Sequence, residues 1–353
     1  MDRMKQNQDT SLPPTINDIA RVAEVSLATV DRVLNSRPGV REKTVRKVHR
    51  AIAKLGYVRD TAAANLARGR LYNFVFILPS NDNEFLASLE LQIQQLQTGL
   101  RHERTRLSFV RVAAFDPMVL AEAIDQIDVS QVDGVAIFGP ETPSVRDSIA
   151  HLKANGITVV SLVADIPSSG RDHFIGVDNV AAGRTAAQLL GRFVSPNDGK
   201  IVVLTGSLLA RDHLERRLGF DEVMARDFPK LQILASLEGW DDPDLVERLL
   251  STVLAETSNI MGIYSAAAGN EGLLRVLKGS GLKQKPAVVA HELTPLSRGA
   301  LNNGIFDAII SQDPGHLIRS AVRVMRAQKD CLPINVAQER IRIDVYLKEN
   351  MPP

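Results

Sequence analysis

Short apolar runs recur along the chain from residue 72 onward and alternate with amphipathic stretches. Runs with the length and composition of buried strands lie at 73–79, 107–115, 133–138, 157–164, 200–205, 231–236, 260–264, 286–291, 307–311 and 341–345. Stretches with helical spacing lie between most of them, at 84–103, 117–127, 143–155, 178–194, 213–227, 243–257, 269–280 and 314–328. Continuous apolar strands that alternate with helices are typical of parallel sheets covered on both faces.

The length of this alternating region predicts two lobes. About 280 residues are too many for one small sheet, so we expect an α/β domain of two doubly wound parallel sheets over 72–346. A ligand cleft should lie between the lobes. We place the first lobe at about 72–174 and 294–326, and the second at about 175–293 and 327–346.

Residues 13–58 show a different pattern, that of short amphipathic helices. Thr15 to Asp18 resembles a capping box for a first helix, and Ser26 is a good N-cap for a second. The turn-forming residues 35–39 end the second helix, and Gly56 ends a third. The inward faces are predicted from apolar residues at helical spacing, namely Ile16, Ile19, Ala20, Ala23, Val30, Val33, Leu34, Val45, Val48, Ile52 and Leu55. Three helices in about forty residues form a helix-turn-helix unit.

The second of these helices has an outward face suited to duplex DNA. In a helix-turn-helix, the second helix lies in the major groove and its first residues face the base edges. The candidate base contacts are Leu27, Ala28, Asp31 and Arg32. Arg32 can donate two hydrogen bonds to guanine, and Leu27 and Ala28 can contact a thymine methyl group. The candidate phosphate contacts are Thr15, Ser26, Thr29 and Asn35.

Charge is distributed unevenly along the chain. The first 70 residues carry 14 Lys and Arg against 7 Asp and Glu, whereas the remaining residues carry 28 against 34. A small basic head on a mildly acidic body favours contact of the head with a polyanion. The alternative for this charge pattern is a solvated surface helix, and the alternative for the DNA-binding helix is a helical bundle that carries an incidental arginine.

Composition excludes several classes of protein. Cys331 is the sole cysteine, which rules out an internal disulfide and a cysteine-based metal cluster. The longest apolar stretches, such as 74–78, are far shorter than the roughly 20 residues that span a bilayer. Residues 1–15 are polar and contain no apolar signal core. We therefore expect a soluble cytoplasmic protein without a membrane partner.

The sequence from Thr15 to Asn35 (TINDIARVAEVSLATVDRVLN) closely resembles the DNA-binding headpiece of the lac repressor (LacI/GalR) family of transcriptional regulators. The resemblance includes Pro38-Gly39-Val40, Lys43-Thr44 and Leu55-Gly56-Tyr57, and it continues at lower specificity through the rest of the chain. It implies a body similar to the periplasmic sugar-binding proteins and a homodimer on a near-palindromic operator. It also implies a hinge helix within 59–71 that inserts Leu66 into the minor groove, with an unstructured tether as the alternative.

Three positions depart from the family pattern. Glu24 stands where the family usually has glycine, and Glu costs more in a left-handed conformation. Asp31 stands where most members have serine, and it either accepts a hydrogen bond from cytosine or orients Arg32. Asp60 replaces the asparagine often found at the start of the hinge helix. The operator sequence is therefore not transferable from relatives.

The resemblance further implies an effector site between the lobes. The residues that match the family's contact positions are Asn83, Phe85, Asp165, Arg216, Asn270, Glu292 and Gln312. Most of them follow predicted strands, and open parallel sheets bind ligands at the carboxyl ends of their strands. Polar groups of this kind suit a hydroxylated ligand, and Phe85 can stack on a sugar face, whereas an ordinary loop or helix-cap role is the alternative for each. Trp240 and His291 are weaker candidates.

Motifs of common enzymes are absent from the sequence. There is no Walker A run and no Gly-x-Gly-x-x-Gly after the first predicted strand, and His291-Glu292 lacks the second histidine of a zinc-binding helix. We therefore expect no catalysis, no cofactor and no metal. The sequence predicts a DNA-binding regulator, a repressor by resemblance, whose operator affinity is controlled by a sugar, polyol or sugar acid. The alternatives are a solute-binding protein without a DNA role and a sugar-modifying enzyme.

Overall fold

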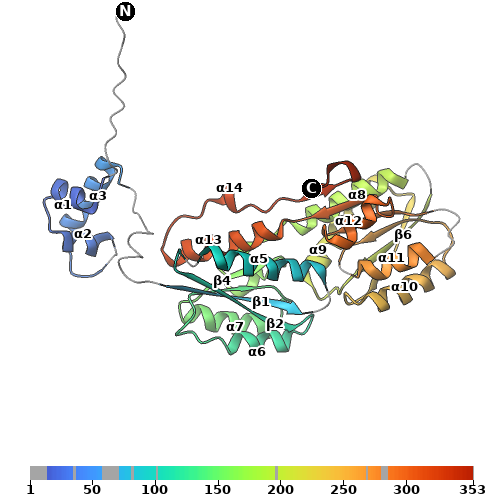
Figure 1. The fold of residues 1–353 in the computed structure, drawn as a ribbon, viewed down its shortest axis with the longest axis horizontal. Coiled ribbons are helices and arrows are strands. Elements are labelled where there is room, and N and C mark those ends of the chain that lie inside the picture. The colour runs from blue at the N-terminus through green and yellow to red at the C-terminus, as the bar shows by residue number, and fades with distance from the viewer. Residues whose placement is uncertain are drawn as a thin grey trace, which may run out of the picture. The chain divides into compact units, whose positions relative to one another are not determined.

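The chain forms two compact units that divide between Arg70 and Leu71 (Figure 1). The computed structural model describes residues 14–34, 37–57, 71–80, 83–100, 102–194, 198–267, 269–279 and 285–352. Each unit is described by itself. The predicted hinge segment, with Asp60 and Leu66, and the predicted phosphate contact Asn35 lie outside the described residues.

The first unit contains three helices around a small apolar core. Their bounds are α1 (Ile16–Ala23), α2 (Leu27–Leu34) and α3 (Glu42–Leu55). The predicted capping box at α1 is present, because the Thr15 hydroxyl accepts a hydrogen bond from the Asp18 amide and the Asp18 carboxylate accepts one from the Thr15 amide. The buried core residues are Ile19, Ala20, Ala23, Val30, Val33, Val48 and Ala51. Ile16 departs from the prediction, since it is 37% exposed.

Both turns that end helices in this unit use left-handed backbone. Glu24 ends α1 with a φ of 51°, and Gly56 ends α3 with a φ of 60°. Glycine adopts this conformation without steric cost, whereas a residue with a β-carbon does not. The strain expected at Glu24 is therefore present in the structure.

The first sheet of the second unit is parallel throughout and has the strand order β2-β1-β3-β4-β5. Its strands are β1 (Tyr72–Ser80), β2 (Thr105–Ala113), β3 (Gly134–Ile137), β4 (Thr158–Leu162) and β5 (His173–Ile175). Its helices are α5 (Glu84–Leu100), α6 (Pro117–Asp125), α7 (Pro143–Ala154) and α13 (Pro314–Lys329). Successive residues of β1 supply opposite faces: Phe74, Phe76 and Leu78 pack toward α5 and α13, and Val75 and Ile77 pack toward α6 and α7.

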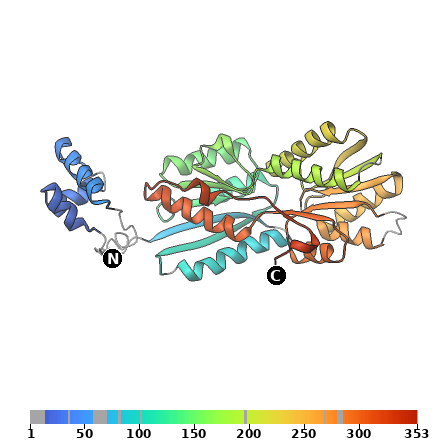
Figure 2. The ribbon, with the colours of Figure 1, turned by 90° about the horizontal axis from the view of Figure 1, so that it is seen from above.

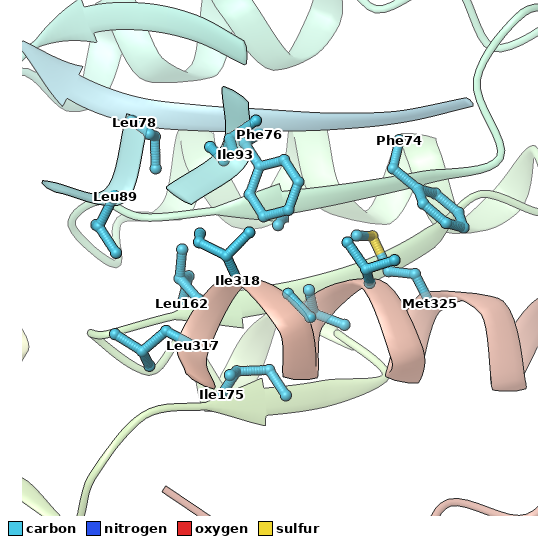
Figure 3. Packing of buried hydrophobic residues seen from close by; sticks show 14 of the residues in the cluster. Phe74, Phe76, Leu78, Leu89, Ile93, Leu162, Ile175, Leu317, Ile318 and Met325 are labelled. Carbon is cyan, nitrogen blue, oxygen red and sulfur yellow. The ribbon is translucent and has the colours of Figure 1, made fainter. Parts of the chain in front are cut away.

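The packing of α13 joins a late segment of the chain to the first sheet. Leu317, Ile318 and Met325 of α13 lie against the strands and share one cluster with Leu89 and Ile93 of α5 (Figure 3). Because Val75 and Ile77 of β1 are buried in the cluster on the other face, β1 is covered on both faces. This agrees with the continuous apolar strands that the sequence pattern predicts for a covered parallel sheet.

The second sheet has the order β11-β10-β9-β8-β6-β7 and is parallel except for β11 (Figure 2). Its strands are β6 (Gly199–Thr205), β7 (Leu231–Glu238), β8 (Ile260–Ser265), β9 (Ala287–His291), β10 (Ala308–Ser311) and β11 (Asp344–Tyr346). Its helices are α8 (Asn179–Val194), α9 (Arg211–Asp227), α10 (Pro243–Glu256), α11 (Asn270–Gly279) and α12 (Pro295–Asn302). α8 and α9 cover one face, and α10, α11 and α12 cover the other.

The predicted lobe boundaries need correction. Residues 294–311 belong to the second lobe, because β10 pairs with β9 and α12 packs on that sheet. The chain therefore crosses between lobes near Gln312, eighteen residues later than predicted. After α13 it stays with the first lobe, since Ile341 joins that core and α14 (Val336–Glu339) packs on α13 through the Arg323–Glu339 ion pair. The return crossing precedes β11.

The sequence pattern missed three short elements, namely β5, α12 and α14. β5 and α14 are too short to show a period, with three and four residues. α12 has few large apolar residues, although Thr294 begins it with a capping box and Pro295 follows at its first position.

Two glycines allow α8 and α9 to approach closely. A β-carbon at Gly183 would lie 1.9 Å from the carbonyl oxygen of Arg216, and one at Gly219 would lie 2.0 Å from that of Val180. These distances leave no room for a side chain, so the backbone carrying Arg216 is placed directly against α8.

We expect Gly183→Ala to lower the free energy of unfolding of the two-lobed unit by about 3 kcal/mol, because the methyl group forces the two helices apart. Chemical denaturation followed by circular dichroism measures this effect. Gly299→Ala is the matched control: its β-carbon meets no atom within 4 Å, so this helical substitution should stabilise by about 0.5–1 kcal/mol. Equal effects of the two substitutions would contradict the packing argument.

We expect Glu24→Gly to stabilise the first unit by about 0.5–1 kcal/mol, since glycine relieves the left-handed strain. Hydrogen exchange of the α1 and α2 amides in the full chain reports the change. Glu24→Ala is the control, because it keeps the strain and also removes the exposed 3.6 Å ion pair with Lys47. A gain of the same size for alanine would show that the backbone conformation is not the cause.

Candidate functional site

The outward face of α2 presents the four predicted base-contact residues. Leu27 is 50% exposed, and Ala28 and Arg32 are also exposed, while Val30 and Val33 point into the core. Asp31 is partly exposed and accepts a hydrogen bond from Nη1 of Arg37 at 3.3 Å. The side chains available for contact with DNA thus lie on a different face of α2 from the side chains that pack in the core.

Two of the three predicted phosphate contacts in the described residues, Thr15 and Ser26, serve as helix caps. Thr15 caps α1, and the Ser26 hydroxyl accepts a hydrogen bond from the Thr29 amide at 3.2 Å. The hydroxyl oxygens of Ser26 and Thr29 lie 2.9 Å apart. All three residues therefore lie at helix N-termini, where backbone N–H groups favour anions.

A cavity lies between the two lobes of the second unit. Its walls are the loops after β1, β2, β3 and β4 of the first sheet and the loops after β6, β7, β8 and β9 of the second. The empty space between these walls is about 1100 Å³ when the solvent at its open mouth is counted. The carboxyl ends of both parallel sheets meet at this space, where the fold rule places ligands.

The backbone around this cavity is strained. Four lining residues other than glycine have positive φ angles: 59° at Phe115, 65° at Val163, 57° at Asp241 and 65° at Glu292. Such conformations cost about 1–3 kcal/mol each and concentrate at binding and active sites. These four residues follow the ends of β2, β4, β7 and β9, so the left-handed backbone lies where the strands reach the cavity wall.

Five of the seven predicted effector residues line the cavity, namely Asn83, Phe85, Arg216, Asn270 and Glu292. The Asn83 side chain also caps α5 by accepting a hydrogen bond from the Phe85 amide at 2.8 Å. The Asn270 side chain accepts a hydrogen bond from the Ser265 hydroxyl at 2.7 Å. Both amides are thus oriented by neighbouring groups.

Asp165 lies outside the cavity wall, contrary to its predicted role. It forms an ion pair with Arg171 and accepts hydrogen bonds from the Ser161 hydroxyl and the Ile166 amide. Burial acts to raise the pKa of Asp165, but the hydrogen bonds from Arg171 and Ser161 outweigh it and lower the pKa. The physical reason for the error is that β4 ends at Leu162, so the chain turns before Asp165 can face the cleft.

Gln312 also lies outside the cavity wall, but it holds a residue that forms the wall. It is 1% exposed, and its amide nitrogen donates to Oε1 of Glu292 at 3.0 Å. Gln312 follows β10 directly, at the crossing between the lobes. This hydrogen bond therefore orients the Glu292 side chain, which lines the cavity.

Arg216 is buried in the second lobe and donates hydrogen bonds to three different segments of it. Its Nε donates to Asn179 at 2.9 Å, Nη1 donates to the Ala266 carbonyl at 2.9 Å, and Nη2 lies 3.5 Å from Oε1 of Glu292. Burial raises the pKa of Glu292 although the Arg216 charge acts to lower it. Each nitrogen of the guanidinium group is thus engaged by the protein itself.

Sequence reasoning missed Asp212, which is 3% exposed and lines the cavity. A usable signal exists, because Asp212 and Arg216 are four residues apart and lie on one face of α9. Phe115 and His213 were missed as well, and their rings lie 6.1 Å apart at the cavity wall.

The two weaker candidates have different positions. His291 lines the cavity but is buried, its Nε2 lies 2.9 Å from the Tyr264 hydroxyl, and burial lowers its pKa well below the usual value. Trp240 is 46% exposed and packs edge-on against the Phe115 ring at 5.6 Å.

No group of three or more His, Cys, Asp or Glu side chains is arranged to hold a metal ion in the part of the chain that the structure describes. No helix within the described ranges is long and apolar enough to cross a membrane.

Solved structures with a similar fold include sugar-binding proteins and one regulator. A solute-binding protein from Burkholderia graminis in complex with D-arabinose has a TM-score of 0.71 and 24% identity, covering 79% of this chain and 96% of that one. GanP, a glucose-galactose binding protein from Geobacillus stearothermophilus, has a TM-score of 0.71 and 20% identity, covering 80% and 100%. A LacI-type transcriptional regulator from Bacteroides fragilis has a TM-score of 0.66 and 18% identity, covering 80% and 98%.

Similar sequences include catabolite control protein A from two bacteria. The protein of Priestia megaterium is 26% identical over 260 residues, which is 72% of this chain and 75% of the relative. The protein of Staphylococcus aureus is 25% identical over 213 residues, which is 60% of this chain and 62% of the relative, less than two thirds of its length.

Two family patterns match the chain in succession. The pattern of bacterial regulatory proteins of the lacI family matches residues 15–60, and that of the periplasmic binding protein domain matches residues 74–330. The first covers the helix-turn-helix unit and the second covers most of the two-lobed unit. The chain therefore belongs to the lacI family of bacterial regulatory proteins, with the family's DNA-binding domain N-terminal to a periplasmic-binding-protein domain.

Proposed function

We propose that this protein is a transcriptional repressor whose affinity for an operator is controlled by a small hydroxylated effector in the inter-lobe cavity. The observation that carries the proposal is the combination, in one chain, of an outward-facing α2 and a cavity between two sheets. The sugar-binding relatives of the two-lobed unit support a sugar-like effector. A DNA-binding regulator acts where the chromosome is, so we propose a cytoplasmic location.

The DNA contacts follow from the geometry of α2. Arg32 would read guanine through two hydrogen bonds, and Leu27 and Ala28 would meet thymine methyl groups. Thr15, Ser26 and Thr29 would place helix N-termini at phosphates. A homodimer would present two copies of α2 to a near-palindromic site.

The effector contacts would come from both lobes. Asn83 and Phe85 lie on the first-lobe wall, and Arg216, Asn270 and Glu292 lie on the second. A ligand that touches both walls favours one arrangement of the lobes, and its binding is then linked to DNA affinity. No catalytic step is part of this proposal.

The second candidate function is solute binding without a DNA role. It is favoured by the solute-binding proteins among the structural relatives. The lacI-family match over residues 15–60 argues against it. A selection of bound sequences from random duplex DNA with the full-length protein separates the two functions, because a solute-binding protein would enrich no sequence.

We expect Arg32→Ala to reduce discrimination between the selected operator and random DNA by about 10- to 100-fold for each half-site, since one bidentate contact to guanine is lost. Mobility-shift titrations against both DNAs measure the ratio. Arg46→Ala is the control, because it removes an exposed positive charge from α3. It should weaken binding to both DNAs alike. Unchanged selectivity in the Arg32 variant would contradict the assignment.

We expect a compound that binds the cavity to raise the melting temperature and to change operator affinity, because the two equilibria are linked. A thermal-shift screen of sugars and polyols identifies such a compound, and calorimetry with and without operator DNA measures the coupling. The operator must change the compound's affinity by the same factor as the compound changes the operator's. A cavity ligand that leaves operator affinity unaltered argues against the regulatory role.

A further inference from the structure

The inter-lobe cavity is acidic. Its described lining residues include the carboxylates Glu84, Asp212, Asp241, Glu271 and Glu292. Among those same lining residues, the only arginine or lysine is Arg216. A site with this charge excess attracts cations and repels anions before any specific contact forms.

Arg216 offsets this excess only in part, because the protein already uses three of its five N–H groups. Its three nitrogen atoms point to Asn179, to the Ala266 carbonyl and to Glu292, and its side chain is 3% exposed. An arginine that recognises a carboxylate or phosphate normally presents two parallel N–H groups to it. The burial and the internal partners of Arg216 make it a weaker group for binding an anion than an arginine whose donors all face the cavity.

Two buried carboxylates each keep one oxygen without a hydrogen-bond partner among the described residues. These atoms are Oδ1 of Asp212 and Oε2 of Glu292. The other oxygen of Asp212 lies 3.7 Å from Nε2 of His213. A buried charged acceptor without a hydrogen bond is unfavourable, so a donor supplied by a ligand would recover part of that free energy.

The two carboxylates also act on one another. Burial is the main cause that raises the pKa of Glu292, and the negative charge of Asp212 raises this pKa further. A positive charge close to both carboxylates would be attracted by each of them.

Aromatic rings complete the wall. Phe85, Phe115 and Phe138 line the cavity, and Phe115 packs against His213 and Trp240 with ring centroids 6.1 Å and 5.6 Å apart. Such rings accommodate the apolar face of a sugar and attract an ammonium group through cation–π interactions.

We propose that the effector is an amino sugar, whose ammonium group is held by the carboxylates of Asp212 and Glu292. This inference rests on the proposed function and narrows its ligand class. It replaces the broader expectation of a sugar, polyol or sugar acid with a cationic ligand, and it disfavours sugar acids and sugar phosphates.

Isothermal titration calorimetry with the full-length protein tests the ligand class. The probes are D-glucosamine, D-galactosamine and D-mannosamine, each compared with its parent hexose and its N-acetyl derivative. D-Gluconate and D-glucose 6-phosphate are the anionic comparators. At least one amine should bind tenfold or more tightly than its parent hexose and its N-acetyl form, and the anions should bind more weakly than the hexoses.

Two variants test the residues. In Asp212→Asn and in Glu292→Gln, the preference for the amine over its parent hexose should fall by tenfold or more, while hexose affinity changes only a few-fold. Asp212→Asn should also raise the melting temperature of the ligand-free protein, because it removes an unsatisfied buried charge. Glu222→Gln is the matched control, since it removes an exposed carboxylate of α9 that pairs with Arg184. It should preserve the preference for the amine.

The outcomes separate this inference from the proposed function. Equal or tighter binding of a hexose or an anion, or no binding of any amine at 10-fold molar excess over millimolar protein, overturns the amino-sugar assignment. The regulatory role still stands if another cavity ligand alters operator affinity. The regulatory role fails, whatever the ligand class, if the protein selects no DNA sequence.

Discussion

The second lobe depends on how one buried arginine is held. The backbone of Arg216 lies against Gly183 of α8, and its guanidinium group reaches Asn179, Ala266 and Glu292. These partners come from α8, the loop after β8 and the loop after β9, so a single side chain fixes three segments around the cavity. A charge at this depth is tolerated only because each nitrogen has an acceptor. The need for these acceptors therefore constrains where the loops after β8 and β9 lie.

The cavity side of this network carries several energetically unfavourable features. Four lining residues adopt left-handed backbone, and Asp212 and Glu292 keep buried oxygens that receive no hydrogen bond from the described residues. Each of these features reduces the stability of the domain, and none is required by the sheets that carry them. Stability is thus concentrated in the apolar layers, and the costs are concentrated where a ligand can reduce them. This distribution is typical of binding sites.

Local signals in the sequence predicted most of the fold, because they depend on neighbours along the chain. The capping box at Thr15, the left-handed turn at Glu24 and the alternating strands and helices are examples. Positions that depend on tertiary contacts were harder to predict. Asp165 follows a strand as expected, but its ion pair with Arg171 turns it from the cleft. Asp212 was missed because its burial depends on how α9 packs.

The contact between Glu292 and Gln312 would provide a route from the proposed ligand to the arrangement of the lobes. Gln312 follows β10 of the second-lobe sheet directly and precedes α13, whose residues pack in the core of the first lobe. A ligand bound to Glu292 would change the hydrogen bonding of the carboxylate that Gln312 contacts. Such a change would act on one of the segments that join the two sheets, where a small rotation would move one lobe relative to the other. Because Gln312 is buried, the free energy of this contact is not lost to solvent screening. Gln312 does not line the cavity itself, but its contact with Glu292 would couple the cavity to lobe movement.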